Sequence, residues 1–157
     1  MPRPLRALLA AVAALLAAAP SAHAVIQIDR GIAGARIGNT KAEVRAALGR
    51  PASVRNLTNE FGPVTVFHYA GGIRVTFQGR RKVTGVSTTG LGDRTSRGVG
   101  VGSRVGAVER RVPGVSCETI GGDRLCHTGE FAAGRRITVF VIRGGKVRRV
   151  DVGIVID

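Results

Sequence analysis

The 157-residue sequence is poor in aromatic and acidic residues. It has no tryptophan, one tyrosine and five phenylalanines, and ten Asp and Glu residues against 24 Lys and Arg residues. Proteins that bind single-stranded nucleic acid combine a basic groove with aromatic side chains on which bases stack. Here the basic residues are spread along the chain rather than clustered between aromatics. We therefore expect no nucleic-acid partner.

Long apolar runs are absent after residue 24. Near the start, Arg3 and Arg6 precede an apolar run at residues 8–19, and Ala22-His23-Ala24 has the small-x-small pattern of a cleavage site. The run is shorter than the roughly 20 residues that a membrane-spanning helix needs. The sequence predicts a secretory signal peptide over residues 1–24, cleavage after Ala24, and a secreted, extracytoplasmic product without a membrane span once the signal is removed.

The formal charge is +14 for the whole sequence and falls to +12 when Arg3 and Arg6 leave with the signal. A charge of this size attracts anionic surfaces through a field that salt screens over about 8 Å. Another secreted or envelope protein, or an anionic cell-wall polymer, is therefore the expected partner.

Cysteine is scarce as well, with only Cys117 and Cys126 in the chain. In an oxidising compartment, two cysteines so close in sequence favour a disulfide. A two-cysteine metal site would need further ligands, which His127 alone does not supply. We expect a disulfide, no metal site and no cofactor.

The sequence repeats itself at an offset of 64 residues without a gap. The matching positions are mostly glycine and apolar residues, which set backbone path and core. Asp29, Arg30, Gly34, Gly38, Val44, Phe67, Ile73, Val75, Lys82, Val83 and Val86 correspond to Asp93, Arg94, Gly98, Gly102, Val108, Phe131, Ile137, Val139, Lys146, Val147 and Val150. We divide the chain into repeats at residues 25–90 and 91–157.

Each repeat is expected to open with a short helix and to continue as a β-hairpin. Thr40 to Glu43 has capping-box spacing, and Ser103 is the expected cap of the second helix. Residues 73–77 with 82–86, and 137–142 with 146–150, alternate with period two and predict antiparallel hairpins. The retained valines within residues 83–86 and 147–150 are three apart, which suggests a β-bulge or a strand start between them in each copy.

The run 38–51, with residues 67–69, 73–77 and Lys82-Val83, resembles the SmpA/OmlA (BamE) type of helix-plus-sheet module. Two such modules in tandem, with secretion and the segment from Cys117 to Cys126, resemble the beta-lactamase inhibitor protein (BLIP) family. The resemblance implies an α+β fold of two tandem helix-plus-antiparallel-sheet repeats. They would form one continuous sheet with short helices on one face and a concave binding face on the other.

No convergent catalytic set is recognisable in the sequence. His68 and His127 belong to no known signature, and a structural role is the favoured interpretation for both. Asp29 and Asp93 are equivalent in the repeat and each precedes an arginine, so capping or a local ion pair explains them. We expect a protein that is not an enzyme and has no catalytic residue.

Candidate binding residues come from the positions that differ between the copies. If Ile73, Val75 and Phe77 face the helices, alternation places a second set of residues on the open face of the sheet. That set would be an apolar centre with a basic rim, a pattern that fits partner binding. Its members are Arg74, Thr76, Phe140, Ile142, Arg148 and His68. The competing interpretations are that another part of the chain covers this face, or that a register slip buries Phe140 in the core.

Two functions follow from these expectations. The first is a secreted, non-enzymatic binding module that inhibits or holds another exported protein through the open sheet face. The alternative is a structural protein of the cell envelope that adheres to anionic wall polymers.

Overall fold

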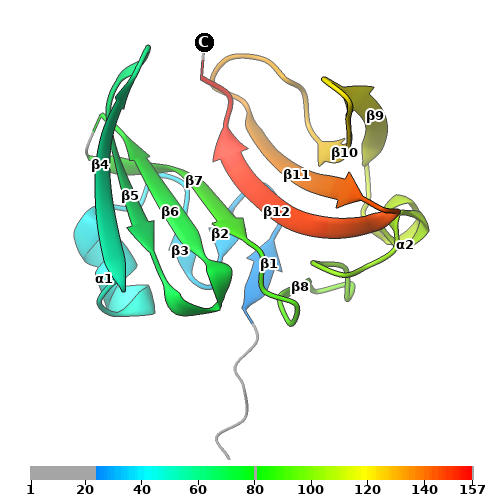
Figure 1. Cartoon of the computed structure of the whole chain (residues 1–157), viewed down its shortest axis with the longest axis horizontal. Helices are drawn as coiled ribbons and strands as arrows, with labels where there is room; N and C mark the ends of the chain where they lie inside the picture. The colour runs from blue at the N-terminus through cyan, green and yellow to red at the C-terminus, as the bar shows by residue number, and fades with distance from the viewer. Residues whose placement is uncertain (1–23, 80, 157) are drawn as a thin grey trace, which may run out of the picture.

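The computed structural model describes residues 24–79 and 81–156, and its main element is an eight-stranded antiparallel sheet (Figure 1). The strand order is β4-β5-β6-β7-β12-β11-β10-β9, so two four-stranded halves meet where β7 pairs with β12. The strands are β4 (Ser53–Asn59), β5 (Gly62–His68), β6 (Arg74–Gln78), β7 (Lys82–Thr88), β9 (Ser116–Ile120), β10 (Asp123–Thr128), β11 (Arg136–Arg143) and β12 (Lys146–Ile154).

A second, smaller sheet has the order β3-β2-β1-β8. Its strands are β1 (Val25–Gln27), β2 (Gly31–Ile32), β3 (Ala35–Arg36) and β8 (Arg94–Thr95). β1 runs parallel to β8, with Ile26 opposite Thr95. The small sheet therefore joins the start of the described chain to a strand from the second predicted repeat.

The described residues form two α-helices and one short 3₁₀ turn, η1 (Ala70–Gly72). α1 (Lys41–Leu48) begins with the predicted capping box: Thr40 Oγ1 accepts from the Glu43 N–H, and Glu43 accepts from the Thr40 N–H. α2 (Val105–Arg111) begins instead after Arg104, while Ser103 Oγ accepts from the Gly100 N–H at 3.1 Å. The capping box is confirmed, and Ser103 as a helix cap is wrong. Neither helix has the length to cross a membrane.

The predicted fold class is wrong. The chain is mostly β and has two sheets, rather than an α+β fold of two helix-plus-sheet repeats that form one continuous sheet. The strands of the small sheet, which were not predicted, are two or three residues long and lie within residues 25–36 and at 94–95. Strands this short show no period-two pattern, since four to eight residues are needed to recognise one. The longer outer strands β4, β9 and β10 were not predicted either.

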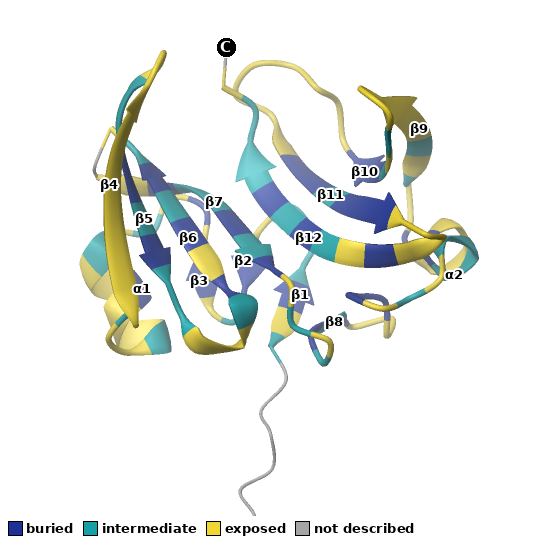
Figure 2. Cartoon of the chain, viewed as in Figure 1, coloured by how far each residue is buried: buried dark blue, intermediate teal, exposed yellow. Residues whose placement is uncertain are grey.

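The hydrophobic core lies on the face of the large sheet that the helices and the small sheet cover (Figure 2). α1 contributes Val44 and α2 contributes Val108, both fully buried, and Ile26 of β1 joins them. Phe67 and Phe77 meet edge to face with ring centroids 4.8 Å apart. Neither of the two described helices lies on the opposite face of the sheet, which we call the open face.

Both predicted β-bulges are present. The β6–β7 register shifts between Thr76 and Phe77, and the β11–β12 register shifts between Val141 and Ile142. Equivalent backbone hydrogen bonds also recur at the 64-residue offset: Gly38 N–H donates to Val83 O, and Gly102 N–H donates to Val147 O.

The open-face placement of Phe140 and Ile142 is wrong, because these residues are 0% and 4% exposed and belong to the core. The cause is the length of the hairpin loops. Three residues separate Gln78 from Lys82, whereas only Gly144 and Gly145 separate Arg143 from Lys146. The missing residue shifts the register by one position, and a one-residue slip moves every side chain to the other face.

The disulfide between Cys117 and Cys126 is present, joining neighbouring strands β9 and β10. No free cysteine occurs in the described part of the chain. Disulfides persist in oxidising compartments, so this bond fits an extracytoplasmic protein.

Asp29 and Asp93 neither cap a helix nor form local ion pairs. Asp29 Oδ1 accepts from the hydroxyls of Thr128 at 2.6 Å and Thr138 at 2.8 Å, which ties the N-terminal segment to β10 and β11. Asp93 accepts from the Thr88 hydroxyl and, through Oδ1, from the Ala24 N–H at 2.9 Å. The local interpretation of both carboxylates is wrong.

The contacts of Ala24 yield a stability prediction. Its N–H donates to Asp93 and its carbonyl accepts from the Arg94 N–H at 3.1 Å, so cleavage after Ala24 would remove both bonds. We expect a chain that begins at Val25 to be less stable than one that begins at Ala24, by about 1–3 kcal/mol. Urea unfolding of the two purified chains measures the difference, and equal midpoints would contradict the structural role of Ala24.

Candidate functional site

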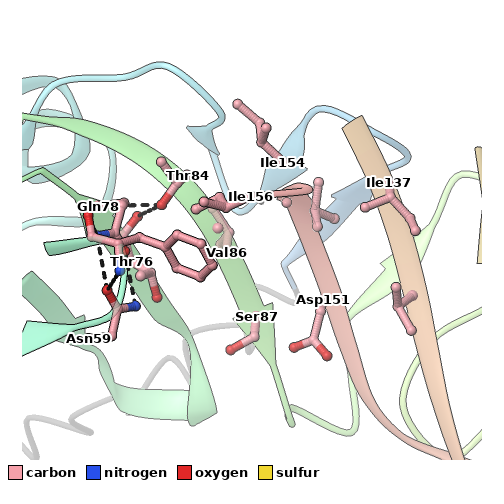
Figure 3. A pocket seen from close by; sticks show the side chains of 15 residues that line it. Asn59, Thr76, Gln78, Thr84, Val86, Ser87, Ile137, Asp151, Ile154 and Ile156 are labelled. Carbon is pink, nitrogen blue, oxygen red and sulfur yellow. Dashed lines mark hydrogen bonds between the residues drawn. The ribbon is translucent and has the colours of Figure 1, made fainter. Parts of the chain in front are cut away.

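The open face is hollowed where β7 and β12 meet. A pocket with a volume of about 420 Å³ lies there, and Gly85 faces Gly153 across the strand pair beneath it (Figure 3). Neither residue has a side chain to fill the space above the sheet. The two glycines thus form the floor of the pocket.

The pocket walls are largely apolar. Ile137 and Val139 of β11 form one side, Thr76 and Gln78 of β6 form the other, and Phe61 contributes from the β4–β5 turn. The remaining lining residues are Asn59, Thr84, Val86, Ser87, Asp151, Val152, Ile154 and Ile156. A ligand with an apolar side chain could be desolvated here. The side-chain amides of Asn59 and Gln78 hydrogen-bond to each other, and the Thr84 hydroxyl accepts from the Gln78 N–H.

A row of mostly polar side chains crosses the open face beside the pocket. The strand registers place one residue of each strand opposite the next. In strand order the row is Ser53, His68, Arg74, Ser87, Asp151, Val139, His127 and Ser116. Ser87, Asp151 and Val139 are the members that also line the pocket.

Among the described residues, Asp151 is the one charged residue that lines this pocket. Burial raises the pKa of its carboxyl above the ordinary value, and Arg149 and Arg74 oppose this shift. Arg149 Nε donates to Asp151 Oδ2 at 2.8 Å. Arg149, on the same strand, therefore balances part of the negative charge of Asp151. The exposed Arg74 side chain lies two strands away in the same row.

His127 is next to last in the row, before Ser116, and is 8% exposed. Its Nε2 is 3.0 Å from Glu118 Oε1, its Nδ1 is 3.1 Å from the Gly129 carbonyl oxygen, and its ring lies 4.6 Å from that of Phe131. These contacts fix the imidazole between β9 and the β10–β11 loop. These contacts give His127 a structural role.

The two histidines do not converge on one point. His68 lies on β5 and His127 on β10, five strand spacings apart in the sheet order. At about 4.8 Å per spacing the separation is roughly 24 Å. Ser87 has Arg74 and Asp151, not a histidine, as its cross-strand neighbours. Within residues 24–79 and 81–156, no group of three or more His, Cys, Asp or Glu side chains could hold a metal ion.

The predicted binding residues are only partly brought together. Arg74, Thr76 and His68 lie on or beside the open face, and Thr76 lines the pocket. Arg148 lies at the bulge of β12 and donates to the carbonyl of Arg143, away from the pocket. Phe140 and Ile142 are core residues, as described above.

Gly85, Gly153, Ser87 and Asp151 were missed by the sequence reasoning. A glycine inside a strand often marks a close approach or an unfilled site, so Gly85 and Gly153 were the available signal. These two glycines indicate a pocket only as a pair, because they leave a space only where they lie opposite each other. Nothing local in the sequence shows that β7 pairs with β12.

The fold is similar to known structures. One is an extracellular protein containing a SCP domain from Bacillus anthracis, with 10% sequence identity and a TM-score of 0.52 over 75% of this chain and 44% of that chain. Another is a DUF4309 family protein from Bacillus subtilis, with 19% identity and a TM-score of 0.50 over 77% of this chain and 82% of that chain. This chain thus spans less than half of the Bacillus anthracis protein.

No family model matches the chain, and no curated protein matches it. At 10% and 19% identity, the two structural likenesses show the fold alone. Neither protein is described as a beta-lactamase inhibitor or a BamE-type protein. The resemblance to those families stays a prediction.

The pKa of Asp151 generates a prediction about stability and pH. A carboxyl whose pKa is higher in the folded state favours folding at low pH, and that contribution is lost as the pH rises through the raised pKa. We expect Asp151→Asn to raise the melting temperature at pH 7, with a gain that shrinks as the pH falls toward about 4.

Thermal unfolding between pH 4 and pH 7 measures this effect. Asp123→Asn is the control, because its carboxylate pairs with Arg143 at the exposed end of β10. A lower melting temperature for Asp151→Asn at pH 7 would show that the Arg149 contact outweighs the cost of burial.

Proposed function

We propose that the chain is a secreted, non-enzymatic binding protein that holds a segment of another exported protein on the open face of the large sheet. The observation that carries the proposal is the pocket above Gly85 and Gly153, which leaves apolar walls without a covering side chain. Pockets of this kind, apolar with a few polar groups, are the usual form of a binding site.

Several features support secretion and binding rather than catalysis. The sequence begins with a signal-like segment, a disulfide joins β9 to β10, and the similar Bacillus anthracis protein is described as extracellular. The two histidines lie far apart on the sheet, and Ser87 lacks a histidine neighbour. A binding role uses the pocket without needing a convergent catalytic set.

Filling the pocket tests the proposal. The backbone of Gly85 is not in the left-handed region, and a Cβ there would lie 3.8 Å from the Thr76 Cβ, an ordinary contact. Gly85→Val should therefore fold with an unchanged melting temperature while occupying the pocket. The partner is the protein that the immobilised parent captures from culture supernatant. We expect Gly85→Val to bind it at least tenfold more weakly than the parent does, which is the effect of losing one hot-spot contact.

Thr119→Val is the matched control, because it places valine on an exposed position of β9 away from the pocket. Unchanged capture by Gly85→Val would contradict the proposal. Retention on isolated cell wall that falls steeply with salt and ignores Gly85→Val would instead support adhesion to anionic wall polymers.

A further inference from the structure

The outer edge of β4 is a second unoccupied feature, separate from the pocket floor. β4 ends the large sheet and pairs with β5 along its whole length, from Ser53 opposite His68 to Asn59 opposite Gly62, without a register shift. All seven residues are exposed, as the uniform colour of this strand in Figure 2 shows. Within the described chain, no strand pairs with its other side.

The register identifies which backbone groups point outward. The Gly79 N–H donates to Pro63 O at 2.8 Å, so residues 63, 65 and 67 of β5 bond to β6 and the alternate residues bond to β4. Their partners on β4 are Ser53, Arg55 and Leu57. The remaining residues, Val54, Asn56 and Thr58, therefore direct their N–H and C=O groups away from the sheet.

This edge has little of the usual protection against strand addition. Proteins block free edges with charged side chains, above all lysine, and with proline, bulges or very short strands. β4 has seven residues, no lysine, proline or bulge, and one charged side chain, Arg55. The opposite edge, β9, is five residues long, is tied to β10 by the disulfide and carries Glu118.

The side chains on and beside β4 determine which residue types a partner strand should carry. Arg55 lies on the open face, and on the helix side Arg45 lies 4.7 Å from the ring of Phe67, the cross-strand neighbour of Val54. Val54 and Leu57 are 46% and 53% exposed and lie on opposite faces of the strand. The edge therefore offers two cations and two apolar surfaces, with no acidic residue inside the strand.

We propose that β4 is a docking edge for an extended acidic segment of a partner protein, which adds to the sheet as an antiparallel ninth strand. The antiparallel direction continues the pattern of the large sheet. An acidic residue would lie opposite Arg55, and apolar residues opposite Leu57 and Val54. Read along the partner, the pattern is apolar, any residue, acidic, apolar.

An acidic partner is favoured over a second copy of the chain. After signal removal each copy carries a charge of +12, so two copies repel each other on approach. An antiparallel pair centred on Asn56 would also place two Arg55 side chains diagonally across from each other, within reach of long side chains.

A synthetic peptide tests the proposal directly. The probe is the acetylated and amidated hexapeptide Thr-Leu-Thr-Glu-Val-Thr, titrated to millimolar concentration into the full mature protein and followed by NMR. We expect slowed amide exchange at Val54, Asn56 and Thr58 but not at their neighbours. Lysine in place of glutamate should weaken binding by on the order of tenfold, because a like-charge pair replaces an opposite pair.

Substitutions on β4 sharpen the test. Thr58→Pro should abolish peptide binding at an unchanged melting temperature, because proline removes an outward N–H that bonds to no strand. Thr58→Val keeps that N–H and should bind normally. Arg55→Glu should reverse the preference, so that the lysine peptide binds better than the glutamate peptide, a result that does not depend on the proline variant folding.

Three outcomes would overturn the proposal: no slowed exchange on β4 at millimolar peptide, peptide binding that Gly85→Val abolishes, or concentration-dependent protection of β4 in the absence of peptide. The last would identify a second copy of the chain as the occupant. Binding that persists in Gly85→Val separates this edge from the pocket, so either proposal can fail alone.

Discussion

The pairing of β7 with β12 is the contact on which the rest of the structure depends. It joins the two halves of the large sheet through four residue pairs, from Thr88 opposite Val150 to Gly85 opposite Gly153. This register sets which residues share the open face. It also places two glycines opposite each other, which leaves a pocket at the centre of that face. The proposed binding site is therefore a consequence of a long-range strand pairing, while the free edge of β4 is a consequence of where the same sheet ends.

Local signals in the sequence predicted local structure well. The capping box at Thr40 and Glu43 depends on a spacing of three residues, and the bulges depend on valines three apart, so both could be read from short segments. The disulfide followed from two cysteines in a chain with a signal-like start. The short strands of the small sheet were missed because their pairing, and not their own sequence pattern, makes them strands.

The predicted binding residues show which placements the sequence could not provide. Arg74 and Thr76 could be placed from the alternation within β6, but Phe140 could not be placed from a gapless repeat. A hairpin loop that is one residue shorter in the second copy moves Phe140 into the core and turns Val139 toward the pocket. Ser87 and Asp151 become neighbours only through the β7–β12 pairing, which no local pattern records.

The register across that pairing is the central claim, and interstrand backbone NOEs in isotope-labelled protein test it most directly. The account predicts NOEs that link residue 85 with 153 and residue 87 with 151, together with Phe140 ring contacts to Val150 and Cys126, its cross-strand neighbours. NOEs that pair these strands one position out of this register, with the Phe140 ring in solvent, would contradict it.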